Sequence, residues 1–480
     1  MKVFCAFLVV LFTVSTQAQD IVYNAKYTDV IKKSHLKKHV YALAADSLEG
    51  RGTGQPGITK AARYIAAQFE EIGLHPFNDS TFFQPLPLWQ WHWGDCFVES
   101  NNQQLSNHEE MVYLSNTPID SITSAQCVFV GYGDHLEGMD LKGKVAFAFV
   151  KNLRSWYQIS NRLKKKEIKA LFIANPENNK QFDVIKAQHQ QFSGGRRVYK
   201  EYPTFSGYQT KTFAFDAHMA QTLFGLPIDS LRNIKLPTVL SLLPKPYVKF
   251  QCPVIVEEFT TDNIIGYLPG TTKNNETLIL TAHYDHIGIN ANHIFPGADD
   301  NASGTAALLE VARALSALPE VLSKHIVFLA TTAEEKGLLG AQYFVNHPEF
   351  HSFDLKANIN IDMIGRRDSA HKENYIYLIG TRHHPEFMTL HQKANTLIDP
   401  LTLDYAYDNQ TGFGNFLNLS DHYAFHKNNI PIIAFFGGLH KDYHKTSDTP
   451  DKIEFKEMTH RVRLIFATAF LAAQKSAFND

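Results

Sequence analysis

Long apolar runs, an excess of charge of one sign and blocks of basic residues are all missing from this 480-residue sequence. No run reaches the roughly 20 residues that a helix needs to cross a bilayer, so we expect no membrane span. Lysine and arginine (46) nearly balance aspartate and glutamate (48), and without a basic block nucleic acid is not expected as a partner. Small substrates are therefore favoured, and the length predicts two or three domains.

Cysteine is also scarce, with four residues in the chain. Cys5 lies in an amino-terminal stretch that we expect to be removed, which leaves Cys96, Cys127 and Cys252. Their spacing is unlike that of metal-binding cysteines, and three thiols allow at most one disulfide. The sequence does not assign its pairing.

Residues 1–18 have the features of a secretory signal peptide. One lysine precedes an uncharged stretch from Val3 to Val14, which is too short for a membrane anchor. The residues that follow, Thr16, Gln17 and Ala18, suit a signal-peptidase site. We therefore predict cleavage after Ala18 and export of the protein, either to the periplasm or out of the cell.

The rest of the sequence divides into three parts by its hydrophobic patterns. Residues 19–106 include an amphipathic helix from Ile58 to Ile72, which Gly73 ends. Residues 107–249 contain short β-prone runs broken by turns, and this texture predicts a β-rich insert. From residue 250 to 480, β-prone runs alternate with amphipathic helices, as in an α/β domain. The strands predicted there are 254–269, 277–282, 325–330, 357–361 and 430–436, and the helices are 303–317, 337–345 and 453–476.

Polar residues stand at the end of the apolar run from Thr277 to Ala282, in the segment TAHYDHIG. Ligands of α/β sheets gather at the carboxyl ends of strands. Four later segments, GADDNASG, TTAEEKG, NINIDMIG and DYHKTSDTPD, also lie at strand ends or in loops, although each alone has an ordinary explanation such as a helix cap or a surface turn. Histidine and carboxylate ligands without cysteine suit catalytic zinc, which keeps a position open for water. Together the segments supply His283, Asp285, Asp300, Glu334, Glu335, Asp362 and His444.

The ordered set TAHYDHIG, PGADDNASG, TTAEEKGLLG, NIDMIG and YHKTSDTPD resembles the two-zinc exopeptidases of metallopeptidase family twenty-eight. That family includes bacterial leucyl-type aminopeptidases and relatives of glutamate carboxypeptidase and of the transferrin receptor. LEGRGTGQPG resembles its amino-terminal segment, and VFVGYGD with DLKGKV resembles the protease-associated insert of some members. The resemblance implies a mixed, mostly parallel β-sheet flanked by helices, with the β-rich insert at 107–249 and the catalytic domain at 250–480.

The resemblance implies two zinc ions held by five side chains: His283 and Asp362 on one ion, Glu335 and His444 on the other, and Asp300 between them. Two neighbouring divalent ions need a shared anion, which a two-oxygen carboxylate supplies. Asp299 competes for this bridging position, but the family pattern favours Asp300 and implies a cis peptide bond between Asp300 and Asn301. Manganese or cobalt could replace zinc at such ligands.

Three further residues take roles from the resemblance. Glu334 precedes a ligand, and since successive side chains diverge, it is free to act as the general base that takes a proton from the attacking water. Asp285 matches the residue that orients His283 through its other ring nitrogen. Tyr443 matches a tyrosine that hydrogen-bonds the developing oxyanion in some members, although a tyrosine beside His444 could also be wall packing.

The function implied is that of a zinc aminopeptidase that removes the first residue of a peptide, with apolar residues such as leucine or phenylalanine preferred. A carboxypeptidase or dipeptidase is the alternative, for which Arg366, Arg367 and Arg382 are candidate carboxylate-binding residues. The complete set of five ligands argues against single-zinc glutaminyl cyclases and against a receptor-like binding module, which would have lost ligands. The sequence does not fix the oligomeric state.

Overall fold

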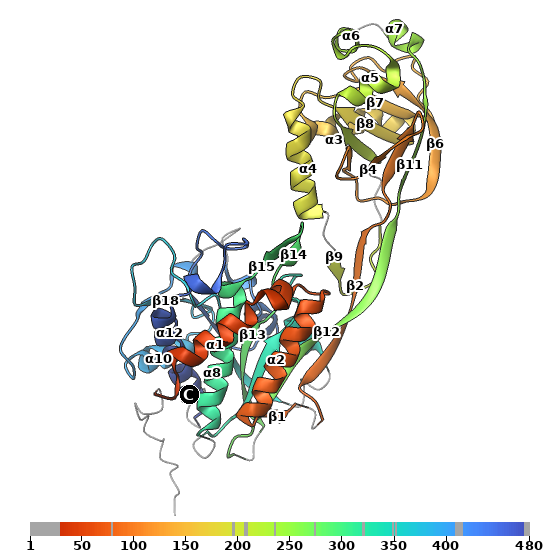
Figure 1. Cartoon of the computed structure of the whole chain (residues 1–480). Helices are drawn as coiled ribbons and strands as arrows, with labels where there is room; N and C mark the ends of the chain where they lie inside the picture. Colours follow the sequence, from red (N-terminus) through yellow and green to blue (C-terminus); the bar gives the residue numbers. More distant parts are fainter. Residues whose placement is uncertain are drawn as a thin grey trace, which may run out of the picture.

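The computed structural model describes residues 29–77, 80–193, 197–205, 210–234, 237–272, 275–318, 322–347, 350, 353–408 and 416–474. The predicted signal peptide, residues 1–18, lies outside the described residues. The chain forms two lobes, each with its own sheet, and two long strands run from the first lobe toward the second (Figure 1).

A ten-stranded mixed sheet forms the centre of the first lobe. Its central strands pair in parallel, β13 with β16 and β17, and β17 with β20. Antiparallel pairs lie on either side of this centre, so the predicted α/β class with a mixed sheet is confirmed. In spatial order the strands are β19 (Thr402–Asp404), β18 (Tyr375–Ile379), β20 (Ile432–Phe436), β17 (Asp354–Asp362), β13 (Glu276–His283), β16 (His325–Thr331), β12 (Val254–Leu268), β2 (Phe83–Trp93) and β9 (Arg197–Tyr199), with β1 (His75–Pro76) paired to β12.

Helices cover both faces of this sheet, and its central strands are therefore buried on both sides, with mainly apolar side chains in β16 and β20 and the buried amides of Asn358 and Asn360 in β17. Along β13, Leu278 and Leu280 face one helical layer, whereas Ile279 between them packs into a separate cluster on the opposite face. The first layer contains α1 (Lys33–Leu43), α2 (Pro56–Ile72), α8 (Gly304–Ser316), α10 (Glu386–Asn395) and α12 (Phe455–Ala472), and the second contains α9 (Leu339–Asn346) and α11 (His422–Lys427).

Helix α2 shows how local sequence sets an element in place. Its buried face includes Ile58, Ala61, Ile65 and Phe69, which recur at helical spacing. Gly73 ends the helix in the left-handed conformation at φ +85°, where a side chain would be strained. The helix predicted from Ile58 to Ile72 is therefore confirmed.

The second lobe has an eight-stranded sheet and its own apolar core. This sheet begins and ends outside the predicted 107–249 segment, because strands that precede residue 107 pair beside the strand that ends at Cys252. Its strands in spatial order are β4 (Gln103–Ser106), β3 (Phe97–Ser100), β11 (Tyr247–Cys252), β6 (Ile119–Phe129), β7 (Val145–Phe149), β8 (Ala170–Ala174), β10 (Thr212–Phe215) and β5 (Met111–Tyr113), and its helices are α3 (Trp156–Leu163), α4 (Lys180–Ser193), α5 (His218–Phe224), α6 (Ile228–Arg232) and α7 (Pro237–Leu242).

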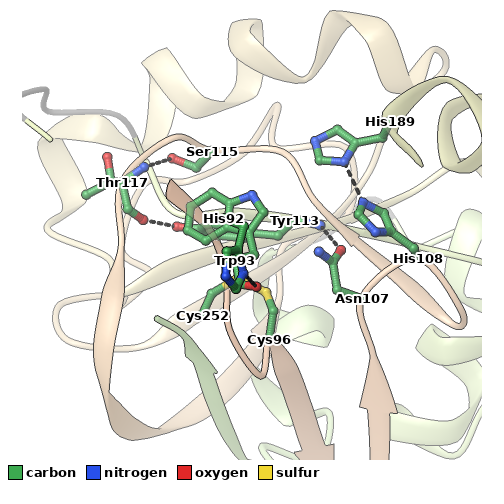
Figure 2. Close-up of a disulfide and its surroundings, with 10 residues drawn as sticks. All are labelled: His92, Trp93, Cys96, Asn107, His108, Tyr113, Ser115, Thr117, His189 and Cys252. Carbon is green, nitrogen blue, oxygen red and sulfur yellow. Dashed lines mark hydrogen bonds between the residues drawn. A yellow bond between two sulfur atoms is a disulfide. The ribbon is translucent and has the colours of Figure 1, made fainter. Parts of the chain in front are cut away.

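A disulfide closes the base of the second lobe. Figure 2 shows Cys96 joined to Cys252 beside Trp93, the last residue of β2. Cys127 is a buried thiol, and burial raises its pKa. The three cysteines thus form one bridge and leave one thiol, within the single-disulfide limit set by the sequence. Among the described residues, no helix is both long and apolar enough to cross a membrane.

Candidate metal centre

The polar segments of the first lobe meet at the carboxyl ends of its central strands. Strand β13 ends at His283 and β17 ends at Asp362, while Glu334 and Glu335 follow β16. Asp300 lies in the segment before α8. His444 follows β20 and completes a cluster in which all five predicted ligands lie close together.

Asp300 directs one carboxylate oxygen toward each half of the cluster. Its Oδ1 lies 3.5 Å from His283 Nε2, and its Oδ2 lies 3.1 Å from His444 Nε2. On the first side, His283 Nε2 is also 3.3 Å from Asp362 Oδ1. On the second side, His444 Nε2 is also 3.3 Å from Glu335 Oε1. These contacts define two groups of possible metal ligands, which share the Asp300 carboxylate. The first donor group is His283, Asp362 and Asp300, and the second donor group is His444, Glu335 and Asp300.

Asp299, the competing bridge candidate, does not face either group. Its Oδ1 accepts hydrogen bonds from the Gly365 N–H (2.6 Å) and the Ser303 hydroxyl (3.0 Å), and its Oδ2 is 3.1 Å from His440 Nε2. The peptide bond between Asp300 and Asn301 is cis, as the resemblance implied.

The donor spacing fits a pair of divalent ions. Ligands that bind one tetrahedral zinc ion at about 2.0–2.1 Å lie roughly 3.3 Å from one another. The four contacts that join His283 or His444 to another of the five predicted ligands fall between 3.1 and 3.5 Å, close to that separation. Four carboxylates also lie close together here, those of Asp300 and Glu334 buried and those of Glu335 and Asp362 half-buried, so bound cations would offset their mutual repulsion. The residues present therefore fit a two-metal site.

The pKa values of the two adjacent glutamates, Glu334 and Glu335, are shifted in opposite directions. Burial, reinforced by the charges of Glu335, Asp421 and Asp362, raises the pKa of Glu334 well above its usual value despite the attraction of His283. Burial would also raise the pKa of Glu335, but hydrogen bonds from His286 and His444 outweigh it and hold that pKa well below its usual value. The two side chains thus differ in proton affinity although they are neighbours in sequence.

Asp285 differs from the sequence-based expectation in the contact it makes. His283 Nδ1 lies 3.1 Å from the main-chain oxygen of Asp285 but 3.8 Å from its carboxylate, which is beyond hydrogen-bond range. The carboxylate instead accepts the N–H groups of Glu334 (3.0 Å) and Glu335 (3.3 Å) and the hydroxyl of Thr53 (3.0 Å). Asp285 therefore fixes the loop that carries both glutamates, and its carbonyl, not its carboxylate, is closest to His283.

Tyr443 borders the second donor group on its open side. Its ring stacks on that of His444 with the centroids 3.8 Å apart, and the tyrosine is 37% exposed. Burial of its hydroxyl, followed by the charges of Asp300 and Glu335, raises the pKa of Tyr443. The hydroxyl therefore stays protonated and can donate a hydrogen bond.

Arg51 is a residue of the site region that the sequence did not identify. It lies in the segment LEGRGTGQPG, where its sequence position gave no sign of burial, yet the Arg51 side chain is fully buried. Its guanidinium donates hydrogen bonds at 2.6–2.8 Å to the main-chain oxygens of Tyr284, Leu43, Pro296 and Gly297. The loop thereby fastens the end of β13 to the segment that carries Asp300.

His286 is the second residue that was missed, although it lies inside the quoted segment TAHYDHIG. Its side chain is fully buried, and its Nδ1 is 2.8 Å from Glu335 Oε1. Its place four residues beyond the end of the predicted strand gave no indication of the direction of its side chain, so its contact with Glu335 could be seen only in the folded chain.

The fold and the two donor groups define a metallopeptidase-type domain. Residues 263–469 match the family model described as Peptidase family M28, so this part of the chain is similar to M28 peptidases.

The chain spans about half the length of the curated relatives that it matches. Aminopeptidase YwaD of Bacillus subtilis (strain 168) is 30% identical over 224 residues, which is 45% of this chain and 46% of that protein. Leupeptin-inactivating enzyme 1 of Streptomyces exfoliatus is 30% identical over 203 residues, 41% of each chain. Among solved structures, an aminopeptidase from Aneurinibacillus sp. strain AM-1 has a TM-score of 0.54 at 21% identity, with 94% of this chain and 96% of that chain covered. This last similarity extends the shared fold over both lobes.

Proposed function

We propose that this chain is an exported zinc-dependent aminopeptidase that hydrolyses the peptide bond after the first residue of a peptide. The observation that carries the proposal is the position of Asp300 between two histidine–carboxylate groups, with the buried Glu334 beside them. The M28 match and the similarity to enzymes named as aminopeptidases support the reaction class.

Five side chains would hold two zinc ions in the arrangement His283 and Asp362, Glu335 and His444, with Asp300 shared. When bound, such a pair polarises the peptide carbonyl and lowers the pKa of water. Manganese or cobalt would suit the same ligands.

Glu334 is the side chain that moves protons in this proposal. Its Oε2 lies 4.0 Å from His283 Nε2, farther than the carboxylate oxygens of Asp300 and Asp362. Its carboxylate can take a proton from the attacking water and later transfer it to the leaving amine. Asp285 holds the Glu334 main chain in position, and Tyr443 donates its hydroxyl to the oxyanion that forms on the peptide carbonyl.

The ion pairs of two of the three candidate arginines, Arg366 and Arg367, support amino-terminal recognition, whereas the third, Arg382, is exposed. Arg366 donates to Asp442 at 2.8 Å, and Arg367 makes a two-oxygen contact with Glu454 at 2.8 and 2.9 Å. Both guanidinium groups are therefore engaged within the protein. The carboxylates of the centre, in contrast, can accept hydrogen bonds from a free α-amino group.

The test is a set of peptides with the same sequence and different ends, incubated with purified zinc-loaded protein and analysed by mass spectrometry. A free amino terminus should allow stepwise loss of the first residue, best when it is leucine or phenylalanine. Acetylation of the amino terminus should abolish cleavage, because it removes the charge and donors of the amine. Amidation of the carboxyl terminus should have little effect, whereas trimming of acetylated peptides from the carboxyl end would establish the carboxypeptidase alternative.

Export is tested separately by the mass of the mature protein. Protein recovered from outside the cytoplasm of a secreting bacterial host should begin at Gln19, after removal of residues 1–18. Full-length protein confined to the cytoplasm would contradict export without affecting the proposed peptidase activity.

A further inference from the structure

His286 contacts the second donor group but is not among the five proposed ligands. It follows Asp285 on the chain beyond β13, and its side chain is fully buried. Its Nδ1 lies 2.8 Å from Glu335 Oε1 and 3.5 Å from Asp300 Oδ2. Its Nε2 is buried and has no hydrogen-bond partner among the described residues. The contact with Glu335 is thus the closest polar contact of this ring.

The lengths of these contacts separate a hydrogen-bond donor from a metal ligand. His444 Nε2 is 3.1 Å from Asp300 and 3.3 Å from Glu335, close to the roughly 3.3 Å expected for two ligands of one zinc ion. The contact of His286 with Glu335 is shorter, at 2.8 Å, and has the length of a charge-assisted N–H···O hydrogen bond. The shorter contact identifies His286 as a donor to Glu335.

The surrounding backbone holds the His286 ring in one place. The His286 N–H donates to the Arg51 main-chain oxygen at 3.2 Å, and Gly52 forms a β-bridge with His286. A Cβ atom at Gly297 would lie 2.4 Å from Cδ2 of the His286 ring, so only glycine leaves room for the ring at that position. Gly297 also has φ +56°, a conformation that glycine adopts readily.

We propose that His286 is a positioning residue that holds Glu335 in its metal-binding orientation through an Nδ1–H···Oε1 hydrogen bond. This proposal rests on the proposed two-metal function. Hydrogen bonds to metal-binding carboxylates fix their direction, and loss of such a partner typically costs 10–100-fold in metal affinity or activity. The two metal positions are therefore unequal, since the carboxylate of the second one is oriented by a buried imidazole.

The test compares zinc binding by metal-free wild-type protein and four variants, measured with Zn²⁺ alone against a competing chelator. His286→Phe keeps a ring in the space beside Gly297 but removes the donor, and one of the two ions should bind about 10–100-fold more weakly. His286→Asn places an amide N–H near the former Nδ1 and should recover most of the affinity. His444→Ala, which removes a proposed ligand, should lose that ion. His293→Phe, at an exposed histidine on β15 (His293–Phe295), should bind zinc as the wild type does.

Turnover of a leucine-initiated peptide at saturating zinc adds a second readout. His286→Phe should regain most of its kcat there, with little change in KM, because the lost contact acts through metal occupancy. Unchanged zinc affinity in His286→Phe would overturn the proposal. So would complete loss of one ion in both His286→Phe and His286→Asn, since that result would make His286 a ligand. If the wild type binds two ions but cleaves no peptide, the proposed function fails while the result for His286 stands.

Discussion

Glu334 and Glu335 have the same side chain, but their different surroundings give them different expected roles at this site. Both are glutamates in one loop, yet one accepts two histidine contacts and the other faces mainly carboxylates. We expect Glu334→Gln to keep its metals and lose about 10²–10⁴-fold in kcat, because it removes the proton acceptor. Glu335→Gln should instead bind one metal ion more weakly, which elemental analysis after dialysis would measure.

The exposed Glu258 on β12 provides the matched control, and Glu258→Gln should change neither property. An exchange of the two phenotypes would mean that Glu335 is the base and Glu334 the ligand.

His391 on α10 is a residue outside the proposed metal site that should affect how the free energy of unfolding depends on pH. It is fully buried on α10, its Nε2 lies 2.8 Å from the Tyr405 hydroxyl, and burial lowers its pKa from 6.5 to about 4. Because the unfolded chain then binds the proton more readily, this contribution to stability is complete above pH 6.5 and is lost as the pH falls toward 4. The loss amounts to roughly 3 kcal/mol, at about 1.4 kcal/mol for each pH unit.

Urea unfolding of the metal-free protein between pH 7 and pH 4.5 measures this effect. The wild type should lose stability more steeply than His391→Gln, which has no titrating ring, while His135→Gln at an exposed position should follow the wild type. Parallel curves for wild type and His391→Gln would show that His391 does not contribute to acid unfolding.

At the scale of elements, the loop from Asp46 to Gly57 acts as a clamp on the metal centre. Arg51 supplies hydrogen bonds to four main-chain oxygens from three separate segments. Arg51→Met should lower the free energy of unfolding by roughly 4 kcal/mol, because buried carbonyl groups lose a charged donor. Chemical denaturation measures this loss, and Arg63→Met on the exposed side of α2 is the control. Equal stability of both variants would contradict the clamp.

The regular elements near the centre could be predicted because their signals are local. The helix from Ile58 to Ile72 and the strand from Thr277 to Ala282 follow from apolar spacing over a few residues. Strand β9 could not be predicted to leave the second lobe and pair with β2, since its three residues, Arg197–Tyr199, carry no periodic signal. Pairing between distant segments depends on the tertiary fold, and for the same reason nothing in the sequence indicated that β3 and β4, which precede residue 107, pair in the sheet of the second lobe.

The sequence likewise identified part of the candidate site and missed the rest. The seven candidate polar residues could be named because each stands in a short polar segment at a strand end or loop, and those ends meet at one edge of the sheet. The resemblance to the exopeptidase family then selected the five proposed ligands among them. The contacts of Asp285 and His286 could not, because a side chain's direction beyond a strand end depends on the segments packed around it. Arg51 was missed because a buried arginine satisfied by main-chain oxygens has the sequence appearance of a surface turn.

For the whole molecule, the ladder between β2 and β12 is the main connection of the two lobes. It pairs residues from Phe83↔Ile264 to Trp93↔Val254, and the disulfide Cys96–Cys252 lies just beyond its last pair. The second lobe therefore extends from the end of a hairpin-like ladder, and all five proposed ligands lie outside it (Figure 1).

This arrangement predicts that the second lobe can be removed without loss of the metal centre. Trp93 and Val254 are directly paired, so replacing residues 94–253 by Asn-Gly closes the ladder with a two-residue turn of the type that antiparallel strands prefer. The shortened chain should bind zinc with wild-type affinity, because every proposed ligand and the Arg51 clamp remain. It should lose some stability, since Val198 of β9 no longer covers the cluster of Leu88 and Ala333.

Zinc titration, circular dichroism and cleavage of a short leucine-initiated peptide test this variant. Wild-type zinc affinity in a folded chain would establish the first lobe as an independent catalytic unit, and slower cleavage of long peptides alone would assign the second lobe to substrate selection. Full-length protein in which only Cys96 and Cys252 are changed to serine is the matched control, because it breaks the disulfide at the base of the second lobe but keeps both lobes. If the shortened chain fails to fold while this control folds, the second lobe is part of the folding unit of the peptidase domain.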